Sequence, residues 1–391
     1  MKRSVCVVTG SRAEYGMLRW VMEEIRASAA LELRLVVTGA HLSPEFGMTV
    51  SEIESDGFAI DQRVEMLLSA DTPTAIAKSI GLGMIGFADA LEAIKPDILL
   101  VLGDRYEILA AVTAALVARI PVAHVQGGET TVGAIDEAIR HSITKMSQLH
   151  FVAANAYRNR VIQLGEEPSR VFNVGGLGVD GIRKTTLLNR AALEDSLGFR
   201  FLDRNLLVTF HPVTLETQTA ESQMDELFAT LANLLDTAIV FTMPNPDTDG
   251  RVLLEKIKIF CASHKNAYWF SSLGQARYFS CLAQVDAVVG NSSSGLTEAP
   301  TFKIATINIG DRQLGRLRAQ SVIDCSPTRE SIADALATAY SPAFQAKLSA
   351  AVNPYGDGGA ASAIVKTLER CVGETTLKKA FHDLPFQNTF A

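Results

Sequence analysis

The chain has 391 residues, 48% of them hydrophobic and 20% charged, and a formal net charge of -7 at pH 7. This length predicts one large or two ordinary domains, and this composition excludes a disordered chain. The acidic balance argues against a nucleic-acid scaffold, which needs a basic face, but it allows an anionic small ligand held by local basic groups. Five scattered cysteines without a CxxC pair indicate a reducing cytoplasm and no disulfide framework.

Neither a membrane anchor nor a secretory signal is predicted. The apolar run that follows Lys2 and Arg3 is too short for the hydrophobic region of a signal peptide. The most apolar predicted helix, at residues 108–118, is shorter than the ~20 residues that span a bilayer. We therefore expect a cytoplasmic protein with no membrane partner and no nucleic-acid partner.

Strands and helices alternate in the first half of the chain. Short apolar runs predict strands at 5–8, 33–37, 98–103, 122–125, 150–152 and 171–176. Helical spacing of apolar residues predicts helices at 17–25, 76–94, 108–118 and in a segment that ends at 164. Repeated alternation of this kind is typical of a parallel, doubly wound sheet.

A second unit of similar organisation follows a glycine-rich polar segment at residues 175–184. Strands are predicted at 206–210, 238–245, 267–272, 287–290 and 304–310, with helices between them, and a last helix at 360–371. We therefore expect an α/β fold of two facing Rossmann-type domains with a ligand cleft between them. The predicted domains are 1–176 and 177–364, and the segment from about 365 to 391 could cross back onto the first.

Ionisable side chains gather just past two strands of the first predicted domain. In an open α/β sheet, the carboxyl ends of the strands face the ligand crevice. This placement predicts a functional rim, although helix caps and surface ion pairs would also explain it. The residues concerned are Asp104, Arg105, Glu107, His124, Gln126, Glu129, Asp136, Glu137, Arg140 and His141.

Two further loops favour anion binding. The sequence GNSSSGLTE, residues 290–298, joins a predicted strand to a helix, and it offers serine hydroxyls and free backbone N–H groups to a diphosphate. A serine N-cap with Glu298 in the first turn is the alternative. Arg12, in GSRAEYG, could reach a phosphate, or it could be a surface residue beside Glu14. His211, at the end of a strand, could contact a phosphate or pack in the core.

Two apparent motifs fail their context test. GLGMIG, residues 81–86, matches GxGxxG but lies in a helical pattern, so we expect helix packing rather than dinucleotide binding. DTD, residues 247–249, follows two prolines at a predicted helix start, where N-capping is the better explanation. We predict no metal site.

Seven motifs in order, GSRAEYG, VLGDRYE, HxxGGE, IDEAIRHSITKMS, HPVT, GNSSSG and INIGDRQ, give the chain a specific resemblance. From Val5 to about Asp383 it resembles the hydrolysing UDP-N-acetylglucosamine 2-epimerases, which include the NeuC-type enzymes of bacterial sialic acid synthesis. The resemblance implies a GT-B-like fold and a homodimer or homotetramer. The apolar helices at 76–94 and 108–118 could supply an interface, or they could be ordinary core helices.

The resemblance also implies a reaction, the conversion of UDP-GlcNAc and water to N-acetylmannosamine and UDP without NAD or an essential metal. Elimination of UDP would give 2-acetamidoglucal, and hydration would follow. The same chemistry on UDP-N,N'-diacetylbacillosamine or GDP-GlcNAc is an open alternative, as are non-hydrolysing epimerisation, a GT-B glycosyltransferase and a nucleotide-sugar sensor. Fold alone does not choose among them.

The resemblance assigns roles residue by residue. Acid–base work falls on Asp104, Asp136 and the His124–Glu129 loop, which includes Gln126, with Arg140 beside them. Contacts to UDP or the sugar fall on Arg12, Arg105, His211, Asn245, Ser292, Ser293, Gly295, Glu298 and Arg312, of which His211 also stabilises the departing phosphate. The chain departs from some relatives at Gln126, where they carry a carboxylate, and at Gly16 and Met17, where they carry a Ser-Lys pair. The second acid–base role therefore stays open between Glu129 and His124.

Overall fold

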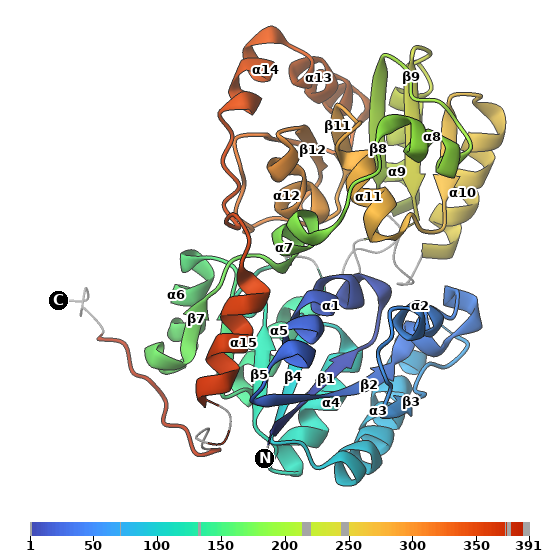
Figure 1. Cartoon of the computed structure of the whole chain (residues 1–391). Helices are drawn as coiled ribbons and strands as arrows, with labels where there is room; N and C mark the ends of the chain where they lie inside the picture. The colour runs from blue at the N-terminus through green and yellow to red at the C-terminus, as the bar shows by residue number, and fades with distance from the viewer. Residues whose placement is uncertain are drawn as a thin grey trace. The chain divides into compact units, whose positions relative to one another are not determined.

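The computed structural model describes residues 2–70, 72–131, 134–212, 220–243, 250–371, 373 and 377–385. The chain divides into two compact units. Unit 1 comprises Met1–Glu129, Asp136–Asp180 and Gly358–Ala391, and unit 2 comprises Thr130–Ile135 and Gly181–Asp357. Each unit has a parallel sheet covered by helices on both faces (Figure 1), which confirms the predicted α/β class.

Unit 1 contains a seven-stranded sheet in the order β3-β2-β1-β4-β5-β6-β7, and all its strand pairs are parallel. Successive residues of a strand face opposite sides of a sheet. Accordingly, Val5 and Val7 enter one core while Cys6 and Val8 enter the other. The strands are β1 Arg3–Thr9, β2 Leu31–Thr38, β3 Gln62–Val64, β4 Ile98–Leu102, β5 Val122–Val125, β6 Leu149–Val152 and β7 Val171–Asn173.

Helices bury both faces of this sheet. Leu18 of α1 and Ile364 of α15 lie in one core, and Phe87 of α3 and Ala111 of α4 lie in the other. The helices are α1 Arg12–Ala27, α2 Val50–Ser55, α3 Pro73–Ile94, α4 Tyr106–Val117, α5 Asp136–Met146, α6 Asn155–Gln163 and α15 Ala360–Cys371, with short 3-10 segments η1 Gly39–Leu42, η2 Pro44–Phe46 and η3 Pro168–Arg170. The helix α7 Leu177–Lys184 begins in unit 1 and ends in unit 2. The glycine-rich segment expected to be a boundary loop is therefore largely the helix α7.

A buried carboxylate fixes the return of the chain to unit 1. The Asp180 carboxylate accepts hydrogen bonds from the backbone N–H groups of Gly359, Ala360 (3.1 Å) and Ala361 (2.6 Å) at the start of α15. An acid at this position satisfies free N–H groups and complements the helix dipole. The units divide after residues 180 and 357, whereas the sequence placed the boundaries after 176 and 364.

The helix α3 explains the GLGMIG sequence. A Cβ atom on Gly83 would lie 2.8 Å from Met66 Cε, and one on Gly86 would lie 2.7 Å from Val64 Cγ1. These glycines let the helix approach its neighbours, which confirms the helix-packing interpretation. By length and composition α3 could cross a membrane. However, its Phe87 and Leu91 side chains are buried in the core of unit 1, as in a core helix of a globular unit.

Unit 2 contains a six-stranded parallel sheet in the order β10-β9-β8-β11-β12-β13. Its strands are β8 Arg204–Thr209, β9 Thr237–Thr242, β10 Ala267–Phe270, β11 Ala287–Gly290, β12 Ala305–Ile309 and β13 Val322–Cys325. Its helices are α8 Arg190–Leu197, α9 Ala220–Leu231, α10 Gly250–Ser263, α11 Gly274–Leu282, α12 Ser294–Thr297, α13 Arg329–Ala339 and α14 Pro342–Ser349, with the 3-10 segment η4 Ala299–Phe302. All five cysteines of the chain are free, as predicted.

Candidate active site

In unit 1, the carboxyl ends of β4 and β5 deliver the predicted rim. The loop after β4 carries Asp104 and Arg105, and the loop after β5 carries Gln126 and Glu129. Since β4 and β5 are adjacent parallel strands, both loops emerge at one edge of the sheet. The structure therefore brings together side chains that the sequence places in separate loops.

Arg140 of α5 connects these loops. Its guanidinium, only 2% exposed, forms ion pairs with Asp104 and with Glu137, where Nη1 lies 2.8 Å from Oε2. Nη1 also donates to the backbone carbonyl of Glu129 at 2.9 Å. A buried guanidinium with two carboxylates and a carbonyl has its charge compensated and its position fixed. Arg140 thus holds Asp104, the leading predicted acid–base group. The sequence analysis expected these two residues to be neighbours.

The His124 ring is buried, and both of its nitrogens are hydrogen-bonded within the protein, whereas an acid–base group must reach the substrate. It is fully buried, its Nε2 donates to the Gly103 carbonyl at 2.8 Å, and its Nδ1 accepts from the Thr144 hydroxyl at 3.1 Å. Burial lowers the pKa of His124 to about 3, so the ring is neutral. These contacts argue against an acid–base role. They make His124 a clamp between the β4 loop and α5.

The rest of the loop after β5 offers one carboxylate. Gln126 has a left-handed backbone (φ 67°), and its Nε2 lies 3.3 Å from Met17 Sδ of α1. Its amide cannot serve as a base. Glu129 is buried, and Asp136 is half-buried in the first turn of α5. The Glu137 carboxylate contacts Arg140 through Oε2 and lies 3.1 Å from His141 Nε2 through Oε1.

Arg105 is paired within its own loop. Its Nε lies 3.2 Å from Oε2 of Glu107, and the Glu107 side chain is 1% exposed. Glu14 is also buried, and its Oε2 accepts the Gly10 N–H at 2.8 Å. Arg12 does not pair with Glu14; it pairs with Glu52 of α2 at 3.0 Å, and both side chains of this ion pair are partly exposed. The Ser11-x-x-Glu14 pattern is a capping-box signal that the sequence analysis missed.

In unit 2, Asn291 holds the loop that carries His211. Its Oδ1 accepts the His211 N–H at 2.6 Å, and its Nδ2 donates to the His211 carbonyl at 2.8 Å. The carbonyl of Asn291 accepts from Gln313 Nε2 at 2.8 Å and from Arg312 Nη1 at 3.2 Å. One asparagine therefore joins the loops after β8, β11 and β12. The sequence analysis did not single it out.

His211 and Arg312 are neighbours in this arrangement. Burial, with the nearby Arg312 guanidinium as the second cause, holds the pKa of His211 well below its usual value. The imidazole is therefore neutral and can donate or accept a hydrogen bond, while the cationic charge belongs to Arg312. Such a pair suits an anionic ligand, because it supplies one charge and one neutral polar group.

The serine loop lies between β11 and α12. Ser293 is the N-cap of α12 and makes no side-chain capping bond, but the Ser292 hydroxyl accepts the Ser294 N–H at 3.4 Å. A serine side chain therefore contacts the start of this helix, which is compatible with both capping and diphosphate binding. Thr297 donates to the Glu298 carboxylate at 2.8 Å, and burial raises the pKa of Glu298. A Cβ atom on Gly295 would lie 2.6 Å from Thr306 Cγ2, so this glycine is needed for packing against β12. Its expected ligand contact has no support.

The remaining predicted residues are placed as follows. Ser292 and Ser293 are half-buried beside Asn291, which lies at the carboxyl end of β11 with Gly290 before it. Asn245 and the DTD sequence lie outside the described residues. Within the described part of the chain, no three His, Cys, Asp or Glu side chains converge in a way that could hold a metal ion.

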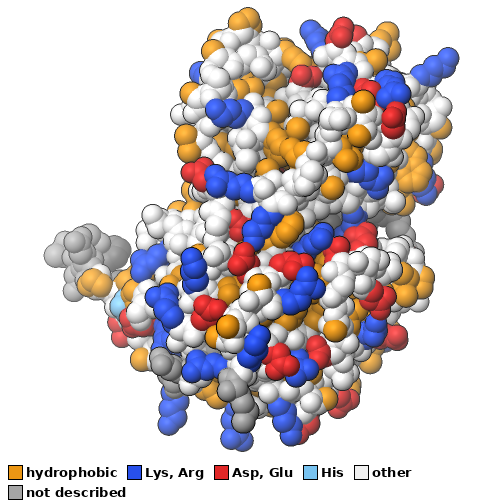
Figure 2. Space-filling view, in the orientation of Figure 1, with side chains coloured by type: hydrophobic (Ala, Val, Ile, Leu, Met, Phe, Trp, Pro, Cys, Tyr) orange, Lys and Arg blue, Asp and Glu red, His pale blue; other side chains and the backbone are white. Residues whose placement is uncertain are grey.

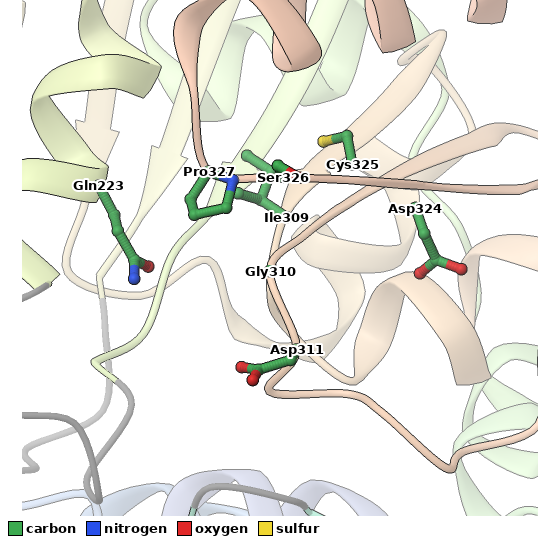
Figure 3. A pocket seen from close by; sticks show the side chains of 8 residues that line it. All are labelled: Gln223, Ile309, Gly310, Asp311, Asp324, Cys325, Ser326 and Pro327. Carbon is green, nitrogen blue, oxygen red and sulfur yellow. The ribbon is translucent and has the colours of Figure 1, made fainter.

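A cavity of about 510 Å³ opens at the carboxyl ends of β12 and β13. Figure 3 shows Gln223 on one side of it and the Asp311 carboxylate on another. Asp311 and Asp324 give it an acidic lining, which disfavours a diphosphate. Its lining residues are Gln223, Ile309, Gly310, Asp311, Asp324, Cys325, Ser326 and Pro327.

On the described surface of unit 1 that Figure 2 shows, acidic and basic side chains are interspersed, and neither sign forms a patch.

Sequence comparisons identify relatives over most of the chain. A family described as UDP-N-acetylglucosamine 2-epimerase matches residues 23–369. The GDP/UDP-N,N'-diacetylbacillosamine 2-epimerase (hydrolyzing) of Campylobacter jejuni is 44% identical over 83% of this chain and 84% of its own length. The polysialic acid biosynthesis protein P7 of Escherichia coli is 38% identical over 98% of each chain. The UDP-N,N'-diacetylbacillosamine 2-epimerase (hydrolyzing) of Legionella pneumophila is 37% identical over 95% of each chain.

Solved structures share the fold at low sequence identity. A UDP-N-acetylglucosamine 2-epimerase structure from Listeria monocytogenes has a TM-score of 0.82 at 20% identity, and covers 98% of this chain and 100% of that chain. The UDP-GlcNAc 2-epimerase of Neisseria meningitidis bound to UDP-GlcNAc has a TM-score of 0.81 at 18% identity, and covers 94% and 100%. These similarities show the two-domain α/β architecture of GT-B-like proteins.

Proposed function

The chain belongs to the UDP-N-acetylglucosamine 2-epimerase family, and from this premise we propose that it is a hydrolysing nucleotide-sugar 2-epimerase that releases UDP. The observation that carries the hydrolysing assignment is the 44% identity, over more than four-fifths of both chains, to a relative named as hydrolyzing. The proposed reaction converts UDP-GlcNAc and water to N-acetylmannosamine and UDP. The E. coli relative named for polysialic acid biosynthesis supports a substrate of this kind.

A second candidate substrate is UDP-N,N'-diacetylbacillosamine, or its GDP-linked form. Two relatives, at 44% and 37% identity, are named for that sugar nucleotide. Both substrates carry an acetamido group at C2 and a diphosphate at C1, so the same acid–base and phosphate-binding groups serve either of them. The remaining parts of the sugar decide between them.

The proposed mechanism begins with elimination. A base removes the C2 proton while the C1–O bond breaks and UDP departs with that electron pair, giving 2-acetamidoglucal. Water then adds its oxygen to C1 and gives one of its protons to a carboxylate, while an acid protonates C2 on the opposite face. The C2 proton is weakly acidic, so each transfer needs a positioned group. We assign these transfers to Asp104 and Asp136, with Glu129 as the further candidate and Arg140 holding Asp104 in place.

The leaving diphosphate needs prearranged donors. We assign these to Ser292, Ser293, His211 and Arg312 of unit 2. The half-buried serines follow Asn291, which holds the His211 backbone and the Arg312 side chain through hydrogen bonds. Arg12 and Arg105 of unit 1 and Asn245 are proposed as further contacts. Glu298 is proposed to accept from the ribose hydroxyls.

A donor screen tests this function. The protein is incubated in deuterated water with UDP-GlcNAc, UDP-N,N'-diacetylbacillosamine or GDP-GlcNAc, and NMR follows the released sugar. We expect free nucleotide and deuterium at C2 of an inverted sugar from one donor. Epimerised sugar that stays attached to the nucleotide would show non-hydrolysing chemistry, and release of nucleotide only with an acceptor would show a glycosyltransferase.

Two variants separate catalysis from binding. Asp104→Asn should abolish turnover and leave UDP affinity largely intact, because the amide keeps the shape but not the basicity. Ser293→Ala should weaken UDP binding measured by calorimetry. A normal turnover rate in the first variant, or an unchanged UDP affinity in the second, would remove that residue from the mechanism.

We also propose a cytoplasmic homodimer or homotetramer. Ile85 of α3 and Val117 of α4 are 66% and 78% exposed, and Leu82 and Leu116 are exposed on the same two helices. The helices α3 and α4 pack against each other, and exposed apolar side chains on such a helix pair favour a protein interface. Ile85→Glu should shift the mass measured by light scattering to that of a monomer, and an unchanged mass would exclude this interface.

A further inference from the structure

Two carboxyl groups are buried together at the carboxyl edge of the unit 1 sheet. Glu14 of α1 is 4% exposed and Glu107 of α4 is 1% exposed. A Cβ atom on Gly10 would lie 3.2 Å from Glu107 Cβ and 3.5 Å from Glu14 Oε2. Both side chains therefore pack on the backbone of the loop that leaves β1. The reaction proposed above gives neither of them a task.

The charges around this pair do not balance if both acids are ionised. Arg105 reaches Glu107 through Nε at 3.2 Å and Nη2 at 3.3 Å. Glu14 accepts the Gly10 N–H at 2.8 Å on Oε2, and the Gly10 and Ser11 N–H groups both favour its ionised form, while its buried Oε1 has no hydrogen-bond partner in the described part of the chain. Two buried like charges beside one cation favour uptake of a proton by one of them.

The other charged groups of this region are engaged elsewhere. Arg12, two residues before Glu14, pairs with Glu52. The His41 ring of η1 is buried between the hydroxyls of Thr9 and Thr49, at 3.0 and 2.7 Å, and burial lowers its pKa to about 4. Arg105 and Glu107 are thus the charged side chains that act on Glu14.

We propose that Glu14 and Glu107 share a single negative charge, and that a proton held on Glu14 makes it a positioning residue for Arg105. With Glu14 neutral, Glu107 alone directs the guanidinium. Loss of the proton adds a second buried carboxylate that attracts Arg105 and weakens its availability to a diphosphate. This inference rests on the proposed function, because Arg105 is there a nucleotide contact. Burial, and next the charge of Glu107, raise the pKa of Glu14 to about 7, so the change falls near neutral pH.

The test compares wild type with Glu14→Gln. Glutamine keeps the size and the oxygen acceptor of the capping box but cannot ionise. Calorimetry measures the Kd of UDP from pH 6 to pH 9, with Glu23→Gln on the same helix as a matched control. We expect the wild-type and Glu23→Gln Kd to rise above pH 7, by up to about tenfold per pH unit for a single linked proton. The Kd of Glu14→Gln should stay at its low-pH value.

Infrared spectroscopy reads the proton without any ligand. The carbonyl stretch of protonated Glu14 should be present at pH 6 in the difference spectrum of wild type minus Glu14→Gln, and it should disappear from that difference by pH 9. Glu107→Gln should also lack it at pH 6, because Arg105 then compensates an ionised Glu14; this variant serves if Glu14→Gln does not fold. Equal pH profiles of Kd in wild type and Glu14→Gln, or an unchanged band in both variants, would overturn the proposal. Absence of UDP binding by wild type at every pH would instead refute the proposed function. In that case the infrared carbonyl stretch of Glu14 alone tests whether Glu14 holds a proton.

Discussion

Asn291→Ala should damage both the stability of the protein and its affinity for UDP. The Asn291 side chain satisfies the N–H and the carbonyl of His211, at 2.6 and 2.8 Å, and all these groups are buried. Truncation removes both of these hydrogen bonds. An unsatisfied buried polar group costs about 1–3 kcal/mol, so we expect a loss of about 2–6 kcal/mol in the free energy of unfolding. That is a large part of the ~5–15 kcal/mol that stabilises a typical domain.

Asn291→Asp refines this prediction. The carboxylate still accepts the His211 N–H, but an acceptor now faces the His211 carbonyl where a donor stood. We therefore expect a loss at least as large as that from one unsatisfied group. In both variants the backbone carbonyl of residue 291 can still accept the hydrogen bond from Arg312. Weaker UDP binding would therefore indicate that His211 is displaced, because the Arg312 guanidinium stays in place.

Denaturant unfolding and UDP calorimetry provide the assay. Asn233→Ala is the matched control. Asn233 is an asparagine of the same unit, and the hydrogen bond from its side-chain amide to the Ala229 carbonyl is exposed. It should change the free energy of unfolding by less than about 0.5 kcal/mol. If the free energy of unfolding of Asn291→Ala differs from that of wild type by less than about 0.5 kcal/mol, Asn291 does not hold His211 and the prediction is wrong.

Three further predictions follow from buried contacts. Burial lowers the pKa of His124 to about 3, so below about pH 6.5 the imidazole takes up a proton in the unfolded chain but not in the folded chain. The free energy of unfolding should therefore fall between about pH 6.5 and pH 3, by up to about 1.4 kcal/mol per pH unit. Denaturant titrations of His124→Gln should lack this part of the pH dependence. Gly290→Ala should give insoluble protein in expression trials, because its φ is 132° and the new Cβ would lie 1.9 Å from the Thr209 carbonyl oxygen. Asp180→Ala should cost about 1–3 kcal/mol by removing the acceptor for the α15 N–H groups, and an unchanged Tm would show that α15 needs no cap.

Sequence pattern was sufficient where burial is continuous and local. The strand β4 is a run of five buried apolar residues, and the strand β5 is buried throughout, so both could be located from the sequence. The positions of Asp104 and Gln126 after these strands followed directly. That Arg140 of α5 lies beside Asp104 was implied by the family resemblance, because α5 is not a loop at the end of a strand.

Pattern failed where long-range packing decides the role of a residue. His124 has the chemistry of an acid–base group, but its partner Gly103 is 21 residues away and burial keeps its ring neutral. Glu14 looks like a surface acid in its own segment. It is buried, and Glu107 of α4, about ninety residues later in the sequence, is close enough for its charge to act on Glu14. Asn291 reads as part of a serine loop, whereas its partner His211 is 80 residues away.

Gln126 and Met17, two positions at which the family resemblance implies a departure from some relatives, lie next to each other. Their side chains are 109 residues apart in sequence, yet Gln126 Nε2 lies 3.3 Å from Met17 Sδ. An amide beside a thioether needs no counter-charge, whereas a carboxylate at 126 needs a cation such as a lysine at 17. Gln126→Glu alone should therefore destabilise the protein more than it does with Met17→Lys added. A thermodynamic cycle over the two single variants and the double variant should give a favourable coupling of about 0.5–3 kcal/mol. Additive effects would show that the two departures are independent, and coupling would confine the second acid–base role to Glu129 and the acids of α5.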